Sequence, residues 1–320
     1  MRAPFGPVML GVVGGIVCSV VAAALPPFAR FVAGELAVLV IVSLGVNLLL
    51  GVAGRLSVAS PAFVGIGANA MTIILLHCRV SVLIAVPLAV AVGWAVGWLL
   101  GLVTLRLQGF YLAVVTFGFL DIFLEVLYSG GAWTGGGYGL IVPVIILPWI
   151  GKLTVNGVVV AAAFTTVVLI VLTQTLQRSR IGRAWIASKN DAAVAELQGI
   201  DVRRVRVQAF AVSSAMITLA GCFEALLLGV TNPSAYSLNV AIEHFTYVVI
   251  GGLGAGTAGP VAGPLVLFAI PEVFRSIGQY REVFYGTILL LTLVLAPRGI
   301  SGALEELPLR SRKLLRRGRP

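Results

Sequence analysis

The stretch that decides the fold is RSRIGRAWIASKNDAAVAELQGIDVRRVR, from Arg178 to Arg206. It is the longest polar, charge-rich stretch before the C-terminal tail, and long apolar runs flank it on both sides. Its middle, from Asp191 to Gln198, predicts a short helix because alanine is a strong helix former, with Gly199 as the stop. A polar helix between apolar segments indicates a docking site for another protein.

The composition of the whole chain is that of an integral membrane protein. Of its 320 residues, 59% are hydrophobic and 11% are charged, and the mean hydropathy is +1.06. Soluble domains carry roughly 25% charged residues, so this chain has more apolar surface than one aqueous core can hide. A membrane-crossing helix needs about 20 apolar residues.

The apolar runs predict ten membrane spans. Their expected ranges are 8–28, 36–51, 61–76, 81–105, 110–128, 157–176, 207–230, 240–253, 259–274 and 283–296. The apolar piece 140–150 is too short to cross, so we expect it to be re-entrant or interfacial. The predicted fold is therefore an all-α polytopic membrane protein. A single transmembrane domain covers residues 1–304, with a polar loop at 178–206, and a basic tail follows at 305–320.

The basic residues predict the orientation. The Arg178–Arg206 stretch and the tail from Arg298 each hold seven of the 22 basic residues. Ten spans place both segments and the N-terminus on one side, which the positive-inside rule makes cytoplasmic. Neither segment has the aromatic interleaving of a nucleic-acid surface, so the net charge of +10 does not indicate nucleic-acid binding.

No motif for covalent chemistry stands out. The sequence contains no Walker A motif, no catalytic Ser/His/Asp arrangement and no metal-binding cluster. We therefore expect no enzyme activity, no cofactor and no metal in this chain. A membrane protein with a docking loop and no nucleotide site fits a permease whose ATP is bound by a separate subunit.

Acidic residues within the spans have two interpretations. Asp121 and Glu125 share a face of one expected helix. They could relay a cation or proton, or they could lie near the end of the span or bond to neighbouring helices. The same alternatives apply to Glu224 and to the pair Glu243 and His244. Titration of such acids during transport would make the chain an ion-coupled secondary transporter, which stays an alternative.

Two Gly-rich joins between consecutive spans are similar to each other. In LLGVAGRLSVASPAFVGIGA (49–68) and VIGGLGAGTAGPVAGPLVLFA (249–269), the glycines at 51 and 54 recur at 251 and 254. Small residues allow close helix packing, and they also allow broken backbone that lines a cavity. Duplicated halves are common in transporters. The candidates for the translocation path are Asn47, Gly51, Gly54, Ser57, Ser60, Gly65, Gly251 and Gly254.

Six ordered blocks resemble the LivM-type permeases of branched-chain amino acid ABC importers. They are NLLLGVAGRLSVASPAFVGIGA (47–68), RLQGFYLAVVTFGFLDI (106–122), TGGGYGL (134–140), SRIGRAWIASKNDAAVAELQGIDV (179–202), VVIGGLGAGTAGPVAGP (248–264) and PRGISG (297–302). The family usually has Gln-Leu-Ser-Leu-Gly-His where this chain has Arg-Leu-Ser-Val-Ala-Ser at 55–60. Relatives in the wider family carry urea, short amides or sugars, so these solutes stay alternatives.

The resemblance implies a heteromeric importer in a bacterial plasma (inner) membrane that works by alternating access. Two similar permeases would form the pore, two cytoplasmic ATPase subunits would bind below, and a periplasmic or lipid-tethered binding protein would deliver the amino acid. It also implies that segment 182–199 is a coupling helix in a cleft of the ATPase. The expected ATPase-coupling residues are Gly182, Arg183, Asp191, Ala193, Glu196 and Gly199.

Overall fold

The structure, a computed structural model, describes residues 26–273 except 79, 108, 132, 144–145, 148–150, 153 and 255, together with Gly15, Thr287 and Leu290. Within that part of the chain, six helical segments are long and apolar enough to cross a membrane. They are α2 (Pro27–Asn47) with its continuation η1 (Leu48–Val52), α3 (Ser60–Cys78), α4 (Val82–Val103), α5 (Phe110–Ser129), α6 (Val155–Arg178) and α9 (Val202–Leu228). The chain is an all-α polytopic membrane protein. The expected spans 8–28 and 283–296 and the tail 305–320 lie outside the described residues, apart from a few positions.

Helix α2 is longer than the sequence predicts. We expect a span from residue 36, but the helix begins at Pro27, because proline suits a first helical position where no N–H is needed. At its other end the helix widens into the π-helical turn η1, where the Ala53 N–H donates to the Leu48 carbonyl at 3.0 Å. Glu35 therefore lies inside a membrane helix.

Helix α9 is the centre of the bundle and packs against α2, α3, α4 and α6. The approach of α4 is close because Gly93, Gly97 and Gly101 all face α9. A side chain at Gly97 would overlap Ser214, whose hydroxyl donates to the Phe210 carbonyl at 2.6 Å. Small residues at four-residue spacing are the usual means by which membrane helices approach this closely.

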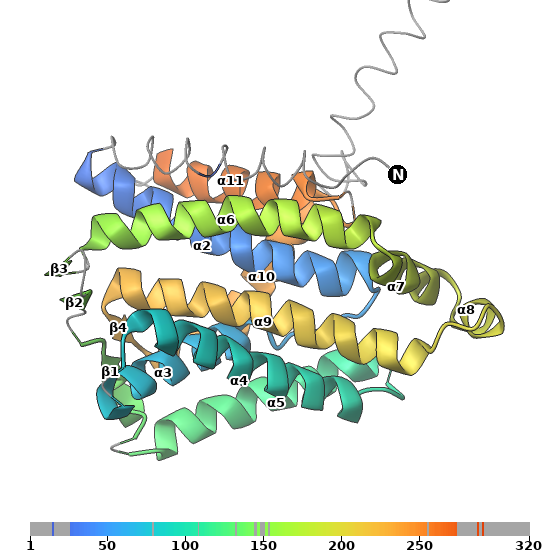
Figure 1. Cartoon of the computed structure of the whole chain (residues 1–320), viewed down its shortest axis with the longest axis horizontal. Coiled ribbons are helices and arrows are strands. Elements are labelled where there is room, and N and C mark those ends of the chain that lie inside the picture. Colours follow the sequence, from blue (N-terminus) through green and yellow to red (C-terminus); the bar gives the residue numbers. More distant parts are fainter. Residues whose placement is uncertain are drawn as a thin grey trace, which may run out of the picture.

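The two ends of the bundle carry different structures (Figure 1). At one end, β1 (Leu140–Ile141) pairs antiparallel with β4 (Val230–Thr231), and β2 (Ile146–Leu147) pairs with β3 (Gly151–Lys152). The expected re-entrant or interfacial piece at 140–150 therefore contains short strands. At the other end, α7 (Arg180–Asn190) and α8 (Ala192–Leu197) extend beyond the long helices.

Two shorter apolar helices complete the described part of the bundle. Helices α10 (Leu238–Gly251) and α11 (Ala258–Val273) pack against each other and against α2. Short 3-10 turns, η2 (Gly136–Tyr138) and η3 (Pro233–Tyr236), lie in the connections before α6 and α10. These positions agree with the spans expected at 240–253 and 259–274.

Candidate functional site

Helix α7 is anchored to the membrane bundle by its one large buried side chain. Trp185 is 1% exposed, and its Nε1 donates to the Val205 carbonyl of α9 at 2.9 Å. The helix begins at Ser179, whose hydroxyl accepts from the Gly182 N–H at 3.3 Å. Gly182 lies directly against the backbone of the last turn of α6, so any side chain there would collide with it.

Helix α8 is capped at both ends by its own residues. The Asp191 carboxylate accepts from the N–H groups of Ala193 and Val194 at 2.9 and 3.1 Å, which is the N-cap arrangement. At the other end, the Gly199 N–H donates to the Glu196 carbonyl, and the next N–H donates to the Ala195 carbonyl. With Gly199 at a φ of 80°, this is a Schellman motif. The predicted helix and its predicted stop are both confirmed.

The outer surface of α8 is apolar as well as charged. Leu197 is 89% exposed and Val194 is 48% exposed. The expected coupling residues Arg183, Ala193 and Glu196 are exposed on the same two helices. Sequence reasoning missed Val194 and Leu197, although two aliphatic residues on so short a polar helix could have indicated a contact surface.

The structure brings the two Gly-rich joins together through one side chain. Asn47 is 1% exposed; its amide donates to the Gly256 carbonyl at 3.2 Å, and its side-chain oxygen accepts from the Gly254 N–H at 3.0 Å. Gly51 lies against the backbone of Gly254, with no room for a side chain. The joins are therefore one contact site between η1 and the turn linking α10 to α11.

Helix α7 reaches this contact site through a lysine. The Lys189 ammonium donates to the Gly51 carbonyl at 2.6 Å. Its aliphatic stem packs on Gly54, which has a φ of 68° and a position where a Cβ would meet that stem. The polar unit formed by α7 and α8 is thus bonded directly to η1.

A buried arginine holds the end of α4 on the same side of the molecule. Arg55 is 4% exposed and donates to the carbonyls of Leu107 and Thr104 at 2.9 and 2.7 Å. Burial, with a smaller contribution from the charge of Arg206, lowers the pKa of Arg55 to about 10. The guanidinium is therefore still charged at neutral pH, where it complements the carbonyl end of the helix.

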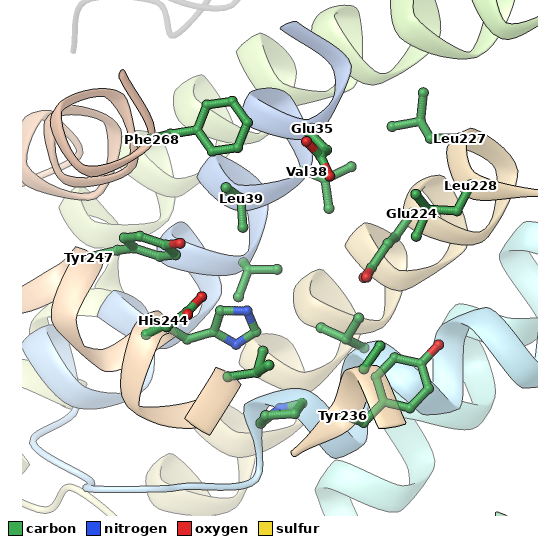
Figure 2. A pocket seen from close by; sticks show the side chains of 16 residues that line it. Glu35, Val38, Leu39, Glu224, Leu227, Leu228, Tyr236, His244, Tyr247 and Phe268 are labelled. Atoms are coloured by element: carbon green, nitrogen blue, oxygen red, sulfur yellow. The ribbon is translucent and has the colours of Figure 1, made fainter. Parts of the chain in front are cut away.

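A cavity of about 190 Å³ lies inside the bundle, and none of the residues that line it belongs to α7 or α8. It is bounded by α2, α3, α9, η3, α10 and α11. Figure 2 shows Glu35 of α2, Glu224 of α9 and His244 of α10 around one space. Nδ1 of His244 lies 3.2 Å from the Ser60 hydroxyl.

The predicted path residues divide into two groups. Asn47, Gly51, Gly54 and Gly254 lie at the Lys189 contact, and Gly251 packs on Gly259 of α11. Ser60 contacts His244 beside the cavity, Gly65 faces Phe123 and Tyr236, and Ser57 lies between these regions near Arg55. The path itself stays a prediction. Sequence reasoning considered Glu224 apart from the pair Glu243 and His244, and it missed Glu35 as their neighbour.

The acids on α5 lie elsewhere. Asp121 and Glu125 are exposed, and the Glu125 carboxylate accepts from the Ser129 hydroxyl at 2.7 Å. Neither lines the cavity. Their shared helical face is confirmed, and it faces away from the described interior.

Comparison with known proteins gives a consistent family. The family described as branched-chain amino acid transport system / permease component matches residues 28–296. The high-affinity branched-chain amino acid transport system permease protein LivM of Escherichia coli is 27% identical over 292 residues, covering 82% of this chain and 67% of that protein. The corresponding permease protein BraD of Pseudomonas aeruginosa is 32% identical, covering 48% of this chain and 52% of its own length. The permease protein LivH of Escherichia coli is 33% identical, covering 44% of this chain and 46% of its own length.

No solved structure matches the chain significantly. The family match extends over most of the chain and includes all six described apolar segments, with only the first residue of α2 outside it. The chain therefore belongs to the permease-component family of branched-chain amino acid transport systems.

Proposed function

We propose that the chain is the membrane-spanning permease subunit of an ABC importer for branched-chain or related hydrophobic amino acids. The observation that carries this proposal is the polar α7–α8 unit, which projects beyond one end of the apolar bundle and is bonded into it through Lys189 and Trp185. The family membership supports the choice of solute.

The α7–α8 unit would dock into a cytoplasmic ATPase. Its caps fix the shape of α8 without help from the rest of the chain, and its exposed Leu197 and Val194 offer an apolar contact with charged neighbours around it. Well-packed apolar anchors inside a polar rim are typical of protein interfaces. In this proposal Arg183 and Glu196 belong to that rim, and Gly199 sets the exit angle of the chain.

Movement of the docked unit would pass into the membrane through the joined Gly-rich turns. Lys189 connects α7 to η1, and Asn47 connects η1 to the turn before α11. A shift of α7 driven by ATP closing the ATPases would therefore act on α2 and on the α10–α11 pair together. Packed helices that switch between two arrangements are the usual basis of such coupling.

The proposal includes a complete topology and set of partners. The chain lies in the plasma (inner) membrane of a bacterium and crosses it ten times. Both termini and α8 lie in the cytoplasm, and segment 140–152 lies at the outer surface. Domain limits of 1–304 and 305–320 belong to the same proposal. A second permease, two ATPase subunits and a binding protein complete the importer, and ATP binds to the partners while this chain holds no cofactor.

The test is uptake by proteoliposomes that contain this chain with its partner permease and ATPases. Leucine, isoleucine and valine, delivered by the binding protein, should accumulate only with ATP inside the compartment that faces α8. Urea, acetamide and ribose serve as alternative solutes. Uptake driven by an ion gradient without ATP, or labelling of Lys189 from outside intact cells, would contradict the proposal.

A further inference from the structure

The end of the bundle that carries α7 and α8 contains a cavity of about 380 Å³. Its wall comes from the loop after η1, the start of α5, the junction of α7 with α8, and the beginning of α9. Among the described residues, it shares no lining residue with the cavity beside Glu35. Most of its surface is polar, so the cavity suits a polar or charged occupant.

Positive charge predominates in this wall. Arg55, Lys189 and Arg206 line the cavity, and Asp191 is the one carboxylate among the described lining residues. The Asp191 carboxylate already accepts from two N–H groups at the start of α8. Within the described part of the chain, the three cations donate only to backbone carbonyls and to no carboxylate. The protein itself therefore leaves most of this charge without a counterion, and the cavity favours an anion.

The cations keep donors that no carbonyl uses. A lysine ammonium has three N–H donors and an arginine guanidinium has five, whereas Lys189 and Arg206 each donate to one carbonyl, the latter at 3.5 Å. Nε of Arg55 is buried and has no partner among the described residues. Burial and, to a smaller degree, the charge of Arg206 lower the pKa of Arg55, so these two cations are close enough to repel each other. An anion in the cavity would offset that repulsion and accept from the spare donors of Lys189 and Arg206.

Exposed apolar side chains continue from the cavity wall. Gly109 and Leu112 line the cavity at the start of α5, and Phe110 and Tyr111 between them are 76% and 73% exposed. Val103, the last residue of α4, is 65% exposed. A basic cavity beside the apolar ends of membrane helices matches an anionic phospholipid, which joins a phosphate and acyl chains in one molecule. A free anion would use only the polar part of this surface.

We propose that this cavity binds the headgroup of an anionic phospholipid, with its phosphate held by Lys189 and Arg206 and its acyl chains lying on the exposed start of α5. Ser188 and Asn190 also line the cavity and offer polar groups to the hydroxyls of a glycerol headgroup. The bound lipid would join the α7–α8 junction to α5 and α9, and it would strengthen the attachment of the polar unit to the bundle. The inference adds a ligand to the proposed function and does not depend on which solute is carried.

The first experiment measures lipid binding to the assembled importer in detergent, by native mass spectrometry during titration with phosphatidylglycerol. Zwitterionic phosphatidylcholine with the same acyl chains is the comparison, and it binds more weakly. Arg206→Gln weakens the tightest binding of phosphatidylglycerol by about tenfold, because a charge-assisted hydrogen bond is lost. The matched control is Arg203→Gln, the same change at an exposed position of α9 outside the cavity, and it leaves the affinity within about twofold.

The second experiment adds a negative charge to the cavity and keeps all three cations. Asn190 is exposed and lines the cavity, so Asn190→Asp changes the charge with almost no change in shape. It should weaken phosphatidylglycerol binding by about tenfold through repulsion of the phosphate. The control is Gln198→Glu, which adds an acid at an exposed position of the same polar unit outside the cavity and leaves the affinity within about twofold. Inorganic phosphate in large excess does not displace the lipid, since it lacks acyl chains.

Several results would overturn the assignment of the cavity. Equal affinity for the two lipids, or variants that resemble their controls, would show that these cations do not select an anionic headgroup. Displacement by inorganic phosphate would assign the cavity to a free anion. Binding to the pair of permeases that is lost when the ATPases are added would assign it to an acidic side chain of the ATPase. Failure of leucine uptake with normal lipid binding would contradict only the proposed function.

Discussion

Replacing Lys189 by methionine keeps most of the length of the side chain and its packing on Gly54, but it removes the donor to the Gly51 carbonyl. That hydrogen bond is 2.6 Å long and only partly buried. Hydrogen bonds from charged groups contribute about 1.5–3 kcal/mol, and partial solvent access favours the lower limit. A loss of about 1.5 kcal/mol corresponds to about tenfold in the equilibrium that joins α7 to η1.

Loss of this hydrogen bond should weaken the coupling between ATP hydrolysis and leucine transport, and it should leave ATP hydrolysis itself unchanged. We expect Lys189→Met proteoliposomes to hydrolyse ATP at the normal rate but to take up about tenfold less leucine per ATP consumed. The assay measures both quantities in the same vesicles. Arg180→Met is the control, because it removes a cation from the exposed surface of the same helix.

An unchanged ratio of leucine to ATP in Lys189→Met would refute the reasoning, because the hydrogen bond would then transmit nothing. An equal fall in the Arg180→Met control would also count against it, since the loss would then come from positive charge in general.

Three further changes test the fold around these sites. Gly199→Ala places a side chain at a φ of 80°. The resulting strain of about 1 kcal/mol should weaken binding of the ATPase by about fivefold, as measured by titration with the ATPase. The control, Gly118→Ala in α5, lies in open space without a positive φ and should leave this affinity unchanged. Gly97→Leu should cost about 1–3 kcal/mol by overpacking against Ser214, seen as a lower melting temperature than Gly118→Leu. Arg55→Ala leaves two carbonyls without their donor, which should lower the free energy of unfolding by about 1–3 kcal/mol for each carbonyl. Arg55→Gln retains one donor group, so its melting temperature should lie nearer to that of the parent protein. Equal melting temperatures of the two variants would contradict this.

The apolar runs and the local signals were enough to predict most helices. Ranges expected at 61–76, 110–128 and 157–176 agree with α3, α5 and α6 within a few residues. The Asp191 cap and the Gly199 stop depend only on neighbours in the sequence, so α8 could be placed without tertiary information. Composition predicted only the second helix of this stretch, because the buried residues of α7 are few and lie among arginines. The resemblance placed one coupling helix over 182–199, where the structure has two helices, α7 and α8.

The features that were not predicted depend on residues distant in the sequence. Segment 140–150 forms strands because Leu140 pairs with Thr231, and nothing near residue 140 specifies that partner. The path candidates were chosen for small size and polarity, but the structure places Asn47 and Gly254 at a contact site beside α7. Glu35 and Glu224 become neighbours only when α2 packs on α9.

The π-helical turn η1 has a consequence for the length of this segment. The Ala53 N–H donates to the carbonyl of Leu48, five positions earlier, whereas the bond in an α-helix spans four positions. The turn therefore contains one residue more than the corresponding turn of an α-helix. Deleting any residue from 48 to 52 would leave a regular α-helix with the same apolar character, yet it would rotate everything beyond it by about 100°. Arg55 would then point away from the carbonyls of Thr104 and Leu107. Apart from Gly51, which has no room for a side chain, selection here should therefore act on the number of residues more strictly than on their identity. Relatives should tolerate substitutions at the other positions of this turn and avoid gaps.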